Sequence, residues 1–82
     1  MEKYYITFRS VTYAQKGERI LNRADITCSM LRTPRWMEAK GCGYALVIRD
    51  FLPAIRALQA EKAAWEKIYR LKEGEKPEVV HL

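Results

Sequence analysis

The chain has 82 residues, which allows one small domain over residues 1–82, and its 49% of apolar residues excludes a disordered polyelectrolyte. Fifteen Lys and Arg against ten Asp and Glu give a net charge of +5, which favours an anionic partner or a well-solvated surface. No apolar run approaches the ~20 residues of a membrane span, and no apolar stretch follows a basic N-terminus, so we expect a cytoplasmic protein without membrane contacts.

The beginning of the chain predicts a strand, a helix and a second strand. Residues 4–8 are β-branched and aromatic, which is typical of a strand with residues 4, 6 and 8 on one face. Ser10 can cap a helix over residues 11–23, where apolar residues recur near helical spacing. Gly17 inside this helix costs about 1 kcal/mol relative to alanine, so we expect close packing on a sheet there. Residues 26–31 predict the second strand.

The middle of the chain predicts a short helical turn and a third strand. Thr33-Pro34 combines a capping hydroxyl with a proline at the first helical position, so a short turn over residues 35–40 is expected. Residues 43–49 are rich in branched aliphatic side chains, which favours a strand at the middle of a sheet.

The last third of the chain predicts a long helix and a final strand. Asp50 can cap a helix over residues 51–73, and Gly74 can end it. Such a helix would be ~34 Å long and would project beyond the strands, where it could meet a partner or a second copy of the chain. Residues 78–82 predict a short last strand.

The predicted order of elements is β-α-β-β-α-β. Short, right-handed connections favour an α+β fold, a ferredoxin-like split β-α-β sandwich with two helices on one face of a four-stranded antiparallel sheet. Because this fold supports many unrelated activities, it does not by itself indicate a function.

Cys42 is the residue most suited to chemistry, since it lies between Gly41 and Gly43 at the start of the third predicted strand. A cysteine reacts as thiolate, and its ordinary pKa of ~8.5 leaves only a small fraction ionised at neutral pH. Glycine amides without side chains can approach and stabilise an anionic sulfur. This arrangement favours a carrier that holds a persulfide, although a small buried side chain beside a turn would have the same sequence.

Three cations occur in the segment that leads to this cysteine: Arg32, Arg35 and Lys40. If they lie near the sulfur, they lower the pKa of its thiol and stabilise a thiolate or persulfide. The alternative is that they are loop residues exposed to water.

The chain lacks the other groups that a turnover enzyme needs. The only histidine is His81, so no Cys/His pair can be proposed, and Cys28 and Cys42 cannot complete a four-ligand zinc site. Gly41-Cys42-Gly43 does not join a strand to a helix, as a phosphate-binding loop does. We therefore expect no metal and no cofactor, and a carrier protein in preference to an enzyme.

Cys28 is expected to pack within the second strand. In a hairpin of the second and third strands, Cys42 would face Leu31, three positions from Cys28. That spacing is ~10 Å along the strand, whereas a disulfide requires Cα atoms within about 7 Å.

Several segments together resemble a known family. They are Tyr5-Ile6-Thr7-Phe8-Arg9-Ser10 before a helix, the stretch from Ile26 to Thr33-Pro34-Arg35, and Cys42-Gly43-Tyr44-Ala45-Leu46. Over roughly residues 4 to 50 the chain resembles the selenium/sulfur carrier-like proteins, which are grouped with the TusA/SirA-type sulfur carriers. The resemblance implies that Cys42 carries a persulfide or selenopersulfide, with Arg35 nearby. It also implies protein partners, namely a sulfur donor such as a cysteine desulfurase and an acceptor.

Two other functions stay open. An RRM-like RNA-binding module would use the stretch Lys40-Gly41-Cys42-Gly43-Tyr44 and Tyr5, although Cys42 replaces an aromatic residue on which a base would stack. An interaction or regulatory module without chemistry would use Tyr4, Trp36, Trp65 and the long helix, which could also hold a homo-oligomer together.

Overall fold

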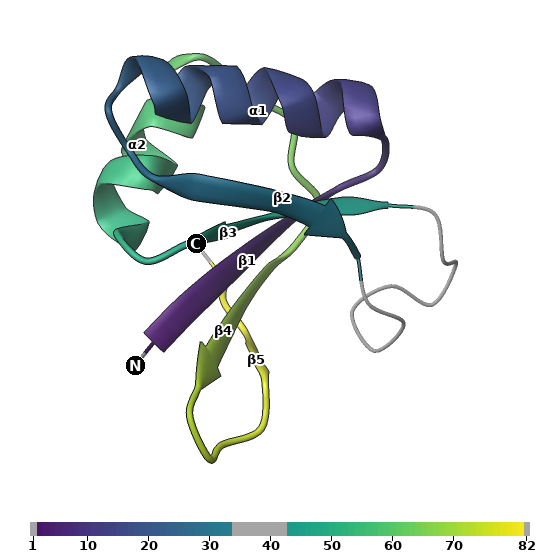
Figure 1. Ribbon diagram of the computed structural model, residues 1–82, viewed down its shortest axis with the longest axis vertical. Helices are drawn as coiled ribbons and strands as arrows, with labels where there is room; N and C mark the ends of the chain where they lie inside the picture. Colours follow the sequence, from purple (N-terminus) through teal and green to yellow (C-terminus); the bar gives the residue numbers. More distant parts are fainter. Residues whose placement is uncertain (1, 34–42, 82) are drawn as a thin grey trace.

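The chain folds into two layers, with two helices packed on one face of a five-stranded antiparallel sheet (Figure 1). The computed structural model describes residues 2–33 and 43–81. The strand order is β2-β3-β1-β4-β5. The elements are β1 (Glu2–Phe8), α1 (Val11–Arg23), β2 (Cys28–Arg32), β3 (Tyr44–Ile48), α2 (Phe51–Ala60), β4 (Ile68–Lys72) and β5 (Glu78–Val79).

Strand β1 lies at the centre of the sheet, between β3 and β4. Ile6 pairs with Leu46 on one side and with Ile68 on the other. Since side chains alternate along a strand, Tyr4, Ile6 and Phe8 share the face that the helices cover, and this prediction is confirmed.

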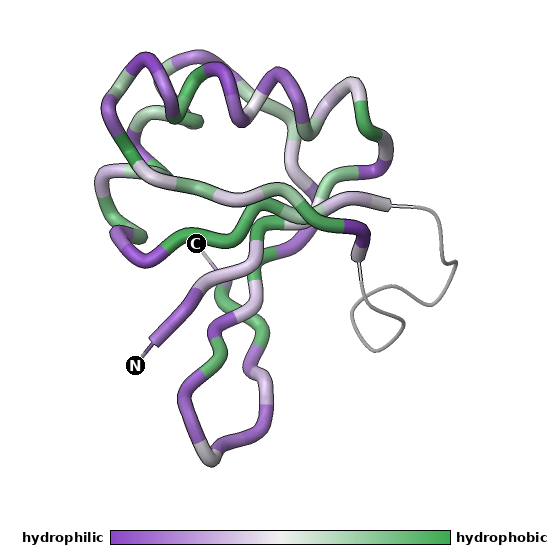
Figure 2. The backbone as a smooth tube through the Cα atoms, in the orientation of Figure 1, coloured by the Kyte–Doolittle hydropathy of each residue, from purple (hydrophilic) through white to green (hydrophobic). Residues whose placement is uncertain are grey.

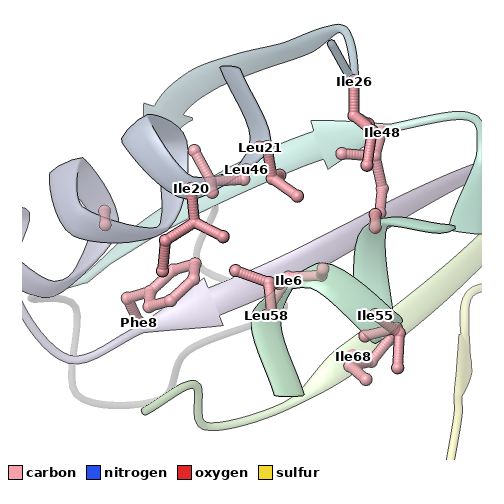
Figure 3. Close-up of a cluster of buried hydrophobic side chains, with 12 residues drawn as sticks. Ile6, Phe8, Ile20, Leu21, Ile26, Leu46, Ile48, Ile55, Leu58 and Ile68 are labelled. Atoms are coloured by element: carbon pink, nitrogen blue, oxygen red, sulfur yellow. The ribbon is translucent and has the colours of Figure 1, made fainter. Parts of the chain in front are cut away.

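The core lies between that face and the two helices (Figure 3). Figure 3 shows Phe8 of β1 beside Ile20 of α1, and Leu46 of β3 beside Leu21. The large side chains that are fully buried are Ile6, Phe8, Leu21, Leu46, Ile48, Leu58 and Ile68. Burying each of these contributes roughly 1.5–3 kcal/mol relative to leaving it in water, so they account for much of the stability of so small a domain.

Gly17 is the point where α1 comes closest to the sheet. A Cβ atom at Gly17 would lie 2.9 Å from Cζ of Phe8 and 3.2 Å from a methyl group of Leu46. The missing side chain therefore permits the close packing that the sequence predicted, and it explains a glycine inside the helix.

Helix α1 has the predicted bounds, and its N-cap is Ser10, whose hydroxyl accepts a hydrogen bond from the Tyr13 amide (3.5 Å). Asp50 is the N-cap residue of α2 as expected, but its side chain makes no capping hydrogen bond. The helical turn expected over residues 35–40 lies outside the described residues. No helix in the described part of the chain is long and apolar enough to cross a membrane.

The prediction of a helix over residues 51–73 is wrong, because α2 ends at Ala60. Lys62 has a φ of 55°, and its amide bonds to the carbonyl of Gln59 (3.0 Å). The amide of Ala63 bonds to the carbonyl of Leu58 (2.9 Å). These two bonds form a Schellman motif, which normally has glycine at the left-handed position. With lysine there, the sequence shows no stop signal, and the basis for an oligomer held by a long helix disappears.

The stretch that was assigned to the end of this helix forms β4, directly beside β1. Gly74 does not end a helix but lies, with a φ of 81°, between β4 and β5. The predicted last strand is shorter than expected and is an additional fifth strand, in which Val79 pairs with Tyr69. This hairpin is largely hydrophilic at its tip, whereas β3 is hydrophobic (Figure 2).

Candidate functional site

The described residues around the candidate cysteine lie at one edge of the sheet, where β1 and β2 end and β3 begins. The amide of Thr33 donates a hydrogen bond to the carbonyl of Gly43 (3.0 Å), which continues the pairing of β2 and β3. A Cβ atom at Gly43 would lie only 2.9 Å from the backbone oxygen of Phe8. Gly43 therefore allows a close approach of the backbone at the end of β1.

Thr33 brings an unusual polar group to this edge. Its side chain is only 8% exposed, and its hydroxyl has no hydrogen-bond partner among the residues that the structure describes. The hydroxyl oxygen would be 3.2 Å from a Cβ atom at Gly43. A buried hydroxyl normally takes part in a hydrogen bond, so Thr33 is a candidate hydrogen-bond donor at this edge.

The same edge is fixed from the other side by Thr7 of β1. Its hydroxyl accepts a hydrogen bond from the Lys67 amide (3.0 Å), and its own amide donates to the Lys67 carbonyl (2.8 Å). The amide of Glu66 donates to the Thr7 carbonyl (2.8 Å). The start of β4 is therefore held against β1 next to the end of the strand.

The structure describes two of the six predicted site residues. Gly43 is buried, and Arg32 is the exposed last residue of β2, opposite Tyr44. The structure therefore brings Gly43 and Arg32 to the same edge. The other four, Gly41, Cys42, Arg35 and Lys40, lie outside the described residues.

Cys28 is a half-buried free cysteine in β2, opposite Ile48. Burial raises the pKa of its thiol, and the negative charge of Glu18 raises it further. The expectation that Cys42 faces Leu31 is wrong, because Leu31 pairs with Ala45. Gly43, which bonds to Thr33, is thus five strand positions from Cys28, or ~16 Å.

The aromatic residues of the two alternative functions have separate environments. Tyr5 pairs with Val47, and Tyr44 pairs with Phe8, so the alternation of side chains puts Tyr5 and Tyr44 on opposite faces of the sheet. They cannot form one platform for stacked bases, which weighs against an RRM-like surface.

The aromatic residues proposed for an interaction module contact the domain itself. Tyr4 stacks on Phe51, with ring centroids 4.3 Å apart, and Trp65 packs against the core. Trp36 lies outside the described residues.

The sequence did not predict that buried Thr33 and the backbone oxygen of Phe8 in β1 would lie at this edge. Thr33 was interpreted only as a helix cap, and its burial depends on the pairing of β2 with β3. The backbone oxygen of Phe8 carries no sequence signal, although the glycine that it approaches does.

The comparisons with known proteins point in one direction. No curated protein and no solved structure matches the chain. The model of one family, described as "Putative Se/S carrier protein-like", matches residues 3–70, most of the chain, in agreement with the resemblance. The chain belongs to this Se/S carrier protein-like family.

Proposed function

We propose that the chain is a carrier of sulfur or selenium that holds a persulfide or selenopersulfide on Cys42. The observation that supports this most is the buried hydroxyl of Thr33, which has no partner among the described residues and lies beside Gly43, the residue that directly follows Cys42. A hydroxyl in this position can donate a hydrogen bond to an anionic sulfur. The family match supports the same function, since its range includes Cys42.

The proposed reaction is a transfer of one sulfur atom without net oxidation. The thiolate of Cys42 attacks the terminal sulfur of a persulfide on the donor protein, and a new S–S bond forms. The donor's S–S bond breaks, the donor cysteine leaves as thiolate, and the proton stays on the terminal sulfur or passes to water. Repetition of this exchange toward an acceptor empties the carrier, so the chain itself needs no cofactor.

Charge and backbone amides would favour the anionic forms of Cys42. The amides of Gly41 and Gly43 can approach the sulfur without a side chain in the way, and Arg35 and Lys40 would add positive charge. Arg32 supports this arrangement from the end of β2, because its exposed side chain starts at the same edge.

Cys28 is the poorer candidate. Burial and Glu18 raise the pKa of its thiol, which reduces the fraction of thiolate at neutral pH. We therefore assign the carrier role to Cys42 alone.

The proposal also covers the fold, the partners and the compartment. We infer a ferredoxin-like split arrangement for β1 to β4, extended by β5, because β1 and β2 lie on either side of β3 and a helix connects them. The partners would be a donor such as a cysteine desulfurase and an acceptor. A free thiol carrier needs a reducing compartment such as the cytoplasm.

A pH profile of alkylation tests the proposal. Iodoacetamide should modify Cys42 at near-neutral pH much faster than Cys28, because only Cys42 would have a lowered pKa. Arg35→Ala should shift the profile of Cys42 to higher pH, with Arg56→Ala as a control far along the chain. Equal rates at the two cysteines in the wild-type chain would contradict the proposal.

A further inference from the structure

A groove runs between α1 and the segment that follows α2, away from the sheet edge with Gly43. It has a volume of about 510 Å³. One wall is formed by Tyr13, Lys16, Arg19 and Arg23 of α1, and the other by residues 61–64. The groove is partly open to solvent, so a segment of another chain can enter it.

The charges along this groove are predominantly positive. Lys16, Arg19 and Arg23 follow one another at three- and four-residue intervals, which puts them on one side of α1. Lys62 adds a fourth exposed cation from the opposite wall. The described lining also contains one carboxylate, Glu61, which is 3.8 Å from Arg23 and offsets its charge, so the lining has a net charge of +3.

The wall that holds Lys62 is a hydrogen-bonded turn in which Lys62 has a left-handed backbone conformation. The Schellman hydrogen bonds of Lys62 and Ala63 fix its backbone at the end of α2. Lysine has a φ of 55° there, where glycine would fit without strain. The turn therefore holds Lys62 beside the groove.

The apolar part of the groove lining, here called its floor, consists of Ile20, Ala63 and Ala64, and Tyr13 adds an aromatic ring. An apolar centre with a charged rim is the usual anatomy of a protein interface, and Tyr and Arg are the residues that most often dominate binding. A simple phosphate would leave the apolar floor uncovered. A protein segment with apolar side chains among its carboxylates would satisfy both parts.

Both walls of the groove lead to the candidate site. Helix α1 begins three residues after Phe8, whose carbonyl approaches Gly43. On the other wall, Ala64 precedes Glu66, whose amide bonds to Thr7 at the same sheet edge. The groove itself lies away from that edge and is connected to it through residues 8–13 and 64–66 of the chain.

We propose that this groove is the docking surface for an acidic segment of a partner protein, with apolar residues that fill the floor and carboxylates that meet the four cations. The inference goes beyond the carrier proposal and does not depend on sulfur chemistry. Its test therefore uses binding alone, on the full chain and on its Cys42→Ser variant.

The probe is a short fluorescein-labelled peptide in which pairs of glutamates alternate with pairs of leucines, and its affinity is measured by fluorescence anisotropy. The double variant Lys16→Glu/Arg19→Glu should weaken binding about tenfold or more, because charge reversal opposes the peptide. The double variant Arg56→Glu/Lys76→Glu makes the same change in net charge outside the groove and should leave binding within about twofold. Lys16→Arg/Arg19→Lys should retain it, and circular dichroism checks that each variant is folded.

Binding measurements with other ligands identify the class of ligand. A peptide with glutamines in place of the glutamates should bind about tenfold more weakly, and backbone amide signals of Tyr13 and Ala64 should shift in NMR spectra on titration with the glutamate peptide. Equal binding by the two double variants, or absence of binding to the wild-type chain, would overturn the proposal. Tighter binding of single-stranded RNA or inorganic polyphosphate at the same residues would also overturn it, in favour of a polyanion site.

Discussion

The carbonyl oxygen of Phe8 lies so close to Gly43 that a Cβ atom there would approach it to 2.9 Å. Because the approaching atom belongs to the backbone of β1, it cannot move aside as a side chain does. Replacement of Gly43 by alanine should therefore displace the start of β3 and destabilise the fold by about 1–3 kcal/mol. Urea denaturation measures this change, and a Gly43→Ala chain as stable as the wild type would show that the two strands are not held together here.

Gly17→Ala should destabilise the chain although alanine is the better helix former. In a solvated helix this change stabilises by about 1 kcal/mol, but here the new methyl group meets the buried ring of Phe8. A net loss of about 1–2 kcal/mol is expected in urea denaturation. Gln15→Ala, at an exposed position of the same helix, is the matched control and should change stability little. A gain in stability with Gly17→Ala would contradict the packing of α1 on the sheet.

Lys62→Gly should stabilise the chain and lower the affinity of the groove for the acidic peptide. Glycine accepts the left-handed conformation at the end of α2 without strain, so the free energy of unfolding should rise by about 1 kcal/mol. The same change removes one of the four cations, and the affinity for the acidic peptide should fall. Lys62→Asn separates the effects, since asparagine tolerates the conformation but carries no charge. Tighter peptide binding by Lys62→Gly would argue against a role for this cation.

Thr33→Val tests the role of the buried Thr33 hydroxyl. Valine has the same shape without the polar atom, so the fold should keep its stability or gain about 1 kcal/mol. If the hydroxyl donates to the sulfur of Cys42, the pKa of that thiol should rise in Thr33→Val and stay low in Thr33→Ser. The pH profile of alkylation at Cys42 measures both. A profile identical in all three chains would remove Thr33 from the site.

Cys28 should make the free energy of unfolding depend on pH in the alkaline range. Burial, with the charge of Glu18, raises the pKa of its thiol in the folded chain above the unfolded value. The folded state therefore holds the proton more tightly, and this contribution to stability is complete below the unfolded pKa, near 8.5–9, and is lost as pH rises through the folded pKa. The stability of the wild-type chain relative to Cys28→Ala should thus decline above about pH 9. A difference that is constant between pH 7 and 10 would mean that the thiol is not buried in solution.

The fold was predictable where side-chain patterns and caps agree. Alternation in β1 and the Ser10 cap before α1 are local signals, and both elements form as predicted. The end of α2 was not predictable, since Lys62 takes the left-handed position that glycine usually marks. Without a stop signal at Lys62, the sequence did not predict β4, because the spacing of its apolar residues also fits a continued helix.

The candidate site was predictable only in part, because part of it depends on contacts between segments that are distant along the chain. Gly43 has a sequence signal because its missing side chain is needed for contact. The burial of Thr33 has no sequence signal, because it depends on the pairing of β2 with β3. The basic groove likewise depends on the turn at Lys62, which brings residues 61–64 against α1.

Intact-protein mass spectra after incubation with a cysteine desulfurase and cysteine test the carrier function most directly. The wild-type and Cys28→Ala chains should gain the mass of at least one sulfur atom, which a reductant removes, and Cys42→Ala should gain none. Sulfur that is retained in Cys42→Ala and lost in Cys28→Ala would contradict the assignment of the carrier to Cys42.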